Sequence, residues 1–168
     1  TEFRSKLLAA TRAGALVVDD KDELAGLDDA ELAAALEAGR ARLTPGKYVI
    51  PLQNTTQQPD LQSLTDRDTR QKLFEASWTR AEKGDKNDTR ATIARIAQIR
   101  AEKAKLLGFE NFAAWQLDNQ MAKSPNTALK FMDDLVPAAT GKARAEAKDI
   151  QDAIDKSGAT FKLEPWDW

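Results

Sequence analysis

A long apolar seam in the last third of the chain restricts its fold more than any other feature. Apolar side chains recur there at steps of three and four residues, which places them on one face of an α-helix. The seam consists of Ala128, Phe131, Met132, Leu135, Ala139, Ala143, Ala147, Ile150 and Ile154. Ser124 and Pro125 precede it as an N-cap residue and a first-turn proline. We predict one helix of about 30 residues, roughly 45 Å long, kinked at Pro137.

Shorter helical patterns cover most of the remaining chain. One predicted helix spans residues 2–13 and stops at Gly14, and another is capped by Asp28 or Asp29 and runs to about Arg42. Thr65 and Asp68 have the spacing of a capping box and predict the start of a third helix. Asn87 or Asp88 is predicted to start a fourth helix, and Gly108 to end it. Their apolar positions are Leu73, Phe74, Trp78, Ile93, Ile96, Ile99, Leu106, Leu107 and, in a shorter helix, Phe112, Trp115, Leu117 and Met121. Five aromatic side chains are expected in the core rather than in a ligand cage: Trp78, Phe109, Phe112, Trp115 and Phe131.

One segment alternates with the period of a β-strand. In residues 47–53 the side chains of Tyr48, Ile50 and Leu52 share a face, and Pro51 places the strand at an edge or beside an irregularity. A lone strand is unstable, and the only other β-prone run nearby is residues 16–18. We therefore predict an antiparallel pair of residues 16–18 with 47–53 in a mainly α fold, a multi-helix bundle in which residues 1–168 form a single segment.

The amino-acid counts exclude several kinds of chemistry. The chain has no histidine and no cysteine, so it can build neither a Ser-His-Asp triad nor a zinc site of the usual ligands. With 25 basic and 27 acidic residues interspersed along the sequence, the net charge of −2 gives no footprint for nucleic acid or an anionic membrane. Catalytic, cofactor-binding and metal-ligating residues are all predicted to be absent.

Three local patterns favour structural roles. Asp20, Asp22 and Glu31 stand near calcium-loop spacing but lack the required glycine and the oxygen ligand at the fifth position, so a solvated acidic helix start is predicted. The N-glycosylation patterns at residues 54–56 and 87–89 are predicted to be a polar loop and a helix cap. Asp133 and Asp134 are adjacent and point in different directions on a helix, so they make no catalytic pair.

The last residues, EPWDW, contain two tryptophans within three positions. Large aromatic side chains are usually kept where they bury area, whereas chain ends are usually frayed and polar. This end is expected to be the point at which a longer protein was cut.

Six stretches, taken in order, resemble one known family. They are ELAGL at 23–27, YVIPLQNTTQQP at 48–59, RQKLFEASWTRAEKGDKNDTR at 70–90, RAEKAKLLGFENFAAW at 100–115, MAKSP at 121–125 and the closing PWDW. Together they resemble the thimet oligopeptidase and neurolysin family of zinc metallopeptidases, in its bacterial peptidyl-dipeptidase (dipeptidyl carboxypeptidase) branch. The resemblance covers essentially the whole chain.

The resemblance implies that the catalytic parts lie elsewhere in the parent protein. In this family a His-Glu-x-x-His helix and a later glutamate bind zinc, and long helices of the non-catalytic region line a channel that admits short peptides. This chain has no counterpart of the zinc ligands, so it resembles a helical scaffold and channel wall, with oligopeptides and the catalytic half of the same protein as its partners. No nucleic acid or membrane partner is expected.

Two hypotheses remain open at this point. The chain is either a scaffold segment of a zinc peptidase that releases C-terminal dipeptides from oligopeptides, inactive and zinc-free when alone, or a stand-alone helical interaction module. Asn54, Thr55 and Gln57 are loop candidates for the channel wall, although a structural turn is the favoured interpretation. The isolated chain is expected to self-associate through an apolar patch, and the parent is expected in the cytoplasm.

Overall fold

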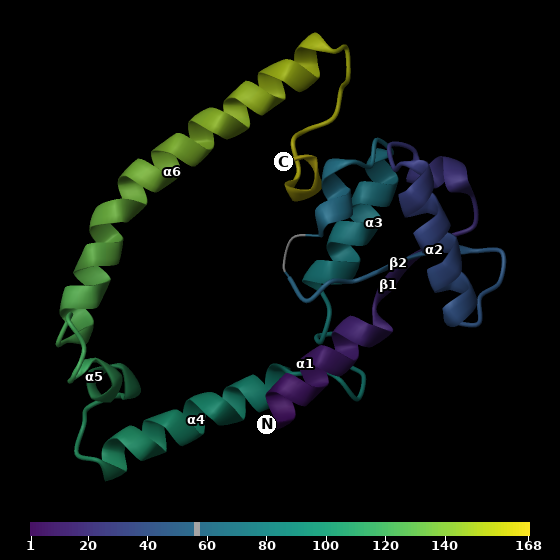
Figure 1. Ribbon diagram of the computed structural model, residues 1–168. Helices are drawn as coiled ribbons and strands as arrows, with labels where there is room; N and C mark the ends of the chain where they lie inside the picture. Colours follow the sequence, from purple (N-terminus) through teal and green to yellow (C-terminus); the bar gives the residue numbers. More distant parts are fainter. Residues whose placement is uncertain (56–57) are drawn as a thin grey trace. The chain divides into compact units, whose positions relative to one another are not determined.

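The fold is mainly α, as predicted. A computed structural model describes residues 1–55 and 58–168, and it divides into two compact units. Unit 1 comprises Thr1–Thr92 together with Glu164–Trp168, and unit 2 comprises Ile93–Leu163. Figure 1 labels the helices and strands of both units. The elements of the described residues are α1 (Glu2–Ala13), β1 (Ala15–Val18), η1 (Lys21–Leu24), α2 (Asp29–Ala41), β2 (Tyr48–Pro51), η2 (Pro59–Gln62), α3 (Arg67–Trp78), α4 (Arg90–Leu106), α5 (Phe112–Leu117), α6 (Pro125–Lys156) and η3 (Pro165–Asp167), the three η elements being short 3₁₀ helices.

The predicted strand pair is present. β1 and β2 are antiparallel, with Leu16 opposite Ile50 and Val18 opposite Tyr48. The second strand is shorter than the predicted 47–53, although the Leu52 amide still donates to the Gly14 carbonyl oxygen at 3.4 Å. Ile50 and Leu52 of the predicted face are buried, and Tyr48 packs against the core cluster, but Val49 on the opposite face is 0% exposed, so the strand is covered on both faces there. The core cluster of unit 1 consists of Leu16, Val18, Leu24, Ala35, Ile50, Leu52, Leu64 and Leu73.

Local capping explains where the helices of unit 1 begin and end. Of the two candidates, Asp28 and Asp29, Asp28 caps α2, and it does so in a full capping box with Glu31. The carbonyl groups that end α1 are satisfied from a distance, since the Arg42 guanidinium donates to the Arg12 carbonyl at 2.8 Å and to that of Ala13 at 3.3 Å. This long-range cap joins the end of α1 to the end of α2.

The predicted cap of α3 is wrong by one residue. Asp66 is the N-cap, because its carboxylate accepts from the Thr69 amide at 2.8 Å. Thr65 instead bonds the Ala25 carbonyl through both its amide and its hydroxyl group. A long-range backbone contact has therefore taken Thr65 out of the capping role that its spacing suggested.

The helices of unit 2 follow their local signals at most ends. Ser124 caps α6 and Pro125 opens it, and the helix continues past Pro137 to Lys156; Figure 1 shows it curving along its length. Gly108, with a φ of +80°, ends α4 in a Schellman motif in which the Phe109 amide reaches the Ala104 carbonyl.

Two expectations for unit 2 and its borders need correction. α4 begins at Arg90 rather than at residue 87 or 88, because Asp88 uses its carboxylate to bind the amides of Gly84 and Arg90 in a turn. α5 ends at Leu117, and Met121 beyond it is fully exposed.

The aromatic side chains are less buried than predicted. Trp78 is 65% exposed and Phe131 is 66% exposed, while Phe109, Phe112 and Trp115 are half-buried. Helical spacing shows which side chains share a face, but it does not show whether another element covers that face. No residue of α6 is buried, and its apolar face (Leu129, Phe131, Met132, Leu135 and Val136) is exposed.

Candidate functional site

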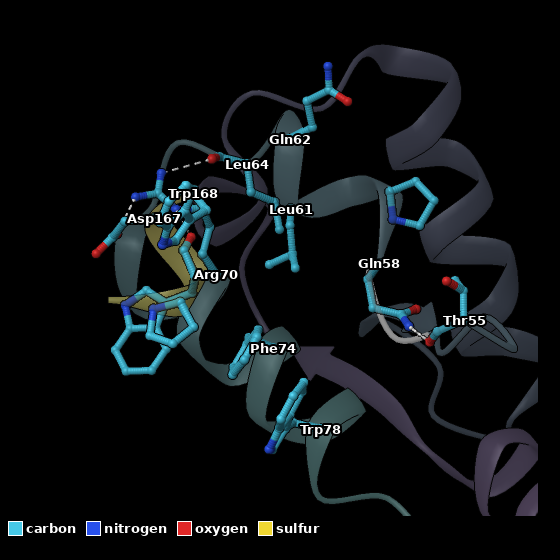
Figure 2. A pocket seen from close by; sticks show the side chains of 13 residues that line it. Thr55, Gln58, Leu61, Gln62, Leu64, Arg70, Phe74, Trp78, Asp167 and Trp168 are labelled. Atoms are coloured by element: carbon cyan, nitrogen blue, oxygen red, sulfur yellow. Dashed lines mark hydrogen bonds and ion pairs between the residues drawn. The ribbon is translucent and has the colours of Figure 1, made fainter. Parts of the chain in front are cut away.

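Unit 1 contains a groove beside α3. Its volume is about 840 Å³. Figure 2 shows Gln58 and Thr55 at one end and Arg70, Asp167 and Trp168 at the other, with Phe74 and Trp78 between them. The lining residues are Thr55, Gln58, Pro59, Leu61, Gln62, Leu64, Arg70, Phe74, Trp78, Pro165, Trp166, Asp167 and Trp168.

Gln58 holds the loop at one end of the groove. Its side chain is almost completely buried, and its Oε1 atom accepts from the Gln53 amide at 2.7 Å. Its Nε2 atom donates to the Thr55 carbonyl and to the Ser77 hydroxyl, each at 2.9 Å. Arg80 adds hydrogen bonds of 2.6 Å to the carbonyl oxygens of Gln53 and Thr55. The loop is thus bound to Ser77 of α3 and to Arg80, which directly follows Thr79, the C-cap residue of that helix.

The last five residues of the chain, Glu164–Trp168, form the opposite wall, and we call them the strap. The Asp167 side chain is 3% exposed and accepts hydrogen bonds from Arg67 and Arg70 at 2.9–3.2 Å. Arg70 also donates to the Trp166 carbonyl at 3.1 Å. Two arginines of α3 therefore fix the strap through both its side chain and its backbone.

Aromatic rings form the surface between these walls. Phe74 stacks on Trp78 at a centroid distance of 5.5 Å, and it meets Trp166 of the strap at 5.9 Å in a tilted arrangement. The Arg67 guanidinium lies 5.6 Å from the centroid of Trp166. These rings give the groove an apolar surface with a cation at one end.

The charged side chains at the strap end of the groove are paired with one another. Burial by itself raises the pKa of Asp167, but the hydrogen bonds from Arg67 and Arg70 outweigh it, so the pKa lies below its ordinary value. The same contact with Asp167 raises the pKa of Arg67. Asp167 therefore stays ionised and paired near neutral pH and is unsuited to act as a general acid or base there.

The described residues hold no metal site. No group of three or more aspartates and glutamates is arranged around a common point in residues 1–55 and 58–168. The Asp20 carboxylate accepts from the Asp22 amide as the N-cap of η1, and the Glu31 carboxylate accepts from the Asp28 amide in the capping box of α2. The acidic stretch that approaches calcium-loop spacing is thus used in helix capping, as predicted.

The loop candidates from the sequence have different positions. Thr55 lines the groove, Asn54 is an exposed bend residue, and Gln57 lies outside the described residues. The most buried polar residue of this loop, Gln58, was not predicted from the sequence. Its neighbour Pro59 begins η2, but nothing in the local pattern separates a buried glutamine from an exposed one.

Unit 2 has a shallower hollow between α4 and α5, of about 410 Å³. Cations cover its aromatic rings: the Lys103 ammonium lies 4.0 Å from the centroid of Trp115, and the Arg100 guanidinium lies 4.9 Å from that of Phe112. This pairing explains how rings at predicted core positions remain half-buried on a helical surface.

Comparison with known proteins now identifies the family. The sequence profile of peptidase family M3 matches residues 61–168, and the chain belongs to this family. Over its whole length it is 52% identical to dipeptidyl carboxypeptidase of Escherichia coli K12 and 50% identical to that of Salmonella typhimurium LT2. It is 29% identical, over 99% of its length, to oligopeptidase A of Escherichia coli K12. The chain spans about a quarter (25%) of the length of each of these relatives. None of the described helices combines the length and apolar character needed to cross a membrane.

Proposed function

We propose that this chain is the non-catalytic helical part of a zinc metallopeptidase that releases C-terminal dipeptides from oligopeptides. The observation that carries the proposal is an identity of 52% that runs across the whole chain and aligns it with 25% of a dipeptidyl carboxypeptidase. The described residues contain no metal-binding group, and the sequence has no histidine or cysteine. The residues present do not fit zinc, so we place the metal and the peptide-cleaving groups in other parts of the protein.

The contribution of this segment would be rigid surface rather than chemistry. α6 has 32 residues, which corresponds to about 48 Å of helix, and α4 adds 17 residues. Helices of this length can form the wall of a channel that admits extended peptides and excludes folded proteins. The exposed apolar face of α6 supports contact with another part of the same protein, since contiguous apolar surface of this kind marks an interface.

The first test is peptide cleavage by the complete protein of the source organism. The purified protein, incubated with an N-blocked tetrapeptide, is expected to release the C-terminal dipeptide, identified by mass spectrometry. Activity is expected to disappear with a chelator and to return with Zn²⁺. Chain 1–168 alone is expected to release no dipeptide with or without Zn²⁺. Metal-dependent turnover by a clean preparation of this chain would contradict the assignment.

A second test separates this role from that of a stand-alone helical interaction module. The source gene is read on both sides of the codons for Thr1 and Trp168. A continuous frame that encodes a His-Glu-x-x-His helix supports the peptidase role. A frame that encodes only this chain supports the interaction module. Fractionation of the source cells, with cytoplasmic and periplasmic marker enzymes, tests the proposed cytoplasmic location.

A further inference from the structure

A row of side chains along α4 forms a second exposed surface of unit 2, distinct from the apolar face of α6. Its members, which we call the α4 row, follow one another at steps of three, four, three and four residues: Ile93, Ile96, Arg100, Lys103 and Leu107. Leu107 directly follows α4, and its amide still donates to the Lys103 carbonyl at 3.1 Å. This is the spacing with which one helix packs along another. Ile93 is 51% exposed and Leu107 is 49% exposed, so both ends of the row are open to a second helix.

The middle of the α4 row is positively charged. The Arg100 guanidinium lies over the ring of Phe112 and the Lys103 ammonium lies over that of Trp115, at 4.9 and 4.0 Å from the ring centroids. Neither cation forms an ion pair with a carboxylate of the described residues, and the acidic residue between them, Glu102, is paired with another arginine of α4 at 3.2 Å. Both charges are therefore available to an incoming carboxylate.

α5 supplies the other side of this surface. Its rings Phe112 and Trp115, with centroids 5.4 Å apart, stand beside Ile96 and Ile99 in the hollow between α4 and α5. No aspartate or glutamate of the described residues lines this hollow. Covering it without a carboxylate would bury two unpaired charges, which is costly. A matching occupant therefore needs a carboxylate for the two cations and apolar side chains for the isoleucines and the rings.

The occupant is expected from the rest of the same protein. This chain spans 25% of the length of the dipeptidyl carboxypeptidases that it matches, so most residues of such a protein lie outside the matched part. A second copy of the chain fits less well. Two α4 rows packed on each other about a two-fold axis would bring cation against cation. The apolar seam of α6 offers no carboxylate, because it is apolar at every position.

We propose that the surface formed by the α4 row and α5 binds a helix from another part of the same protein, and that this helix places an aspartate or glutamate against Arg100 and Lys103. Apolar side chains on either side of that carboxylate pack on Ile96, Ile99 and the two rings. Charge-assisted hydrogen bonds to both cations fix the register of the two helices. The inference rests on the proposed function in one respect, because it requires a longer protein, but it does not require that this protein cleave peptides.

Zero-length cross-linking of the complete protein of the source organism tests this contact. A carbodiimide joins a lysine amine to a carboxylate only where the two are in contact, and mass spectrometry of the digest identifies the pair. Lys103 is expected to be joined to an aspartate or glutamate outside residues 1–168. Lys148 and Asp152, which are 2.6 Å apart on α6, are the positive control. Lys105, an exposed residue on the opposite side of α4, is expected to form no such link.

Charge reversal tests whether the contact stabilises the protein. Lys103→Glu places two carboxylates against each other and is expected to lower the Tm of the complete protein by about 3 °C or more. Lys105→Glu, the matched control, is expected to change the Tm by less than about 1 °C. Replacing the cross-linked acidic residue by lysine in the Lys103→Glu protein is expected to restore the Tm, as in a double-mutant cycle.

A link from Lys103 to an acidic residue elsewhere in the same molecule, with recovery of the Tm on charge exchange, supports the proposal. A link to a second copy, recognised in a mixture of isotope-labelled and unlabelled protein, overturns it. A link confined to residues 1–168, the absence of any Lys103 link, or a Tm that charge exchange does not restore overturns it as well. Dipeptide release is measured on the same preparation. Cleavage without the Lys103 link removes only this inference, and the link without cleavage removes only the proposed function.

Discussion

Gln58 gives the sharpest prediction for the groove. Gln58→Ala removes a carboxamide that accepts from the Gln53 amide at 2.7 Å and donates to the Thr55 carbonyl and the Ser77 hydroxyl. The side chain is 1% exposed, so water cannot replace these bonds without opening the loop. Arg80 still reaches the Thr55 carbonyl in the variant, so the loop keeps one anchor.

The expected cost follows from those three contacts. A buried amide that loses its acceptor costs about 1–3 kcal/mol, and this applies to the Gln53 N–H. The lost bonds to Thr55 and Ser77 add about 0.5–1.5 kcal/mol each, reduced at Thr55 by the remaining arginine. We expect Gln58→Ala to lower the free energy of unfolding by about 2–4 kcal/mol. For a chain of this size that corresponds to a fall in Tm of about 5–15 °C.

Urea denaturation followed by tryptophan fluorescence and circular dichroism measures this loss. Gln62→Ala is the matched control, because Gln62 lines the same groove but is exposed, and its expected change is within about 0.5 kcal/mol. Gln58→Met keeps the length of the side chain without its hydrogen bonds and separates packing from polar contacts. Equal losses in Gln58→Ala and Gln62→Ala would refute the reasoning, as would full stability of Gln58→Met.

Three further predictions concern other parts of the chain. Gly26→Ala is expected to destabilise unit 1 by more than the roughly 1–2 kcal/mol that left-handed backbone strain costs alone. The reason is that a Cβ atom at residue 26, where φ is +101°, would lie 2.0 Å from the backbone oxygen of Ser63. The control is Gly84→Ala, where φ is +72° and the space is open, and it is expected to show the strain alone in the same urea titration. The lowered pKa of Asp167 means that its contribution to stability is present above its unfolded pKa and is lost as the pH falls through its folded pKa, below 3.8. The protection of the strap amides, measured as the exchange rate relative to the intrinsic rate at the same pH, should therefore fall only in that acidic range. The isolated chain is expected to self-associate through the exposed apolar face of α6, and Leu135→Lys should shift it toward monomer in light scattering coupled to size exclusion; a monomer at all concentrations would contradict this.

The sequence predicted the ends of helices correctly where a few neighbouring residues determine where the helix begins or stops. Asp28, Ser124 and Gly108 act on atoms within four residues of themselves, so their roles can be read from the sequence. The prediction failed at Thr65, whose partner Ala25 lies 40 residues away. It also failed for the burial of Trp78, since helical spacing contains no information on what covers a face.

The candidate site was less predictable than the fold. The sequence indicated the NTTQQP loop and the terminal tryptophans separately, and nothing in their spacing showed that they border one groove. The Gln58 side chain donates to Ser77, 19 residues later, and Arg80 binds the same loop at the Gln53 carbonyl. Such contacts form only after the chain has brought α3 against the loop.

The sequence by itself determined the helical class, the strand pair and the lack of histidine and cysteine chemistry, because these follow from local periodicity, short-range capping and residue type. Only the tertiary structure decided that Asp167 binds Arg67 and Arg70 and that the strap forms one wall of the groove beside α3. The chain has 25 basic and 27 acidic residues, so charge alone specifies no partner. The pairing is set when the core of unit 1 orients α3, although all of unit 2 lies between α3 and the strap in the sequence.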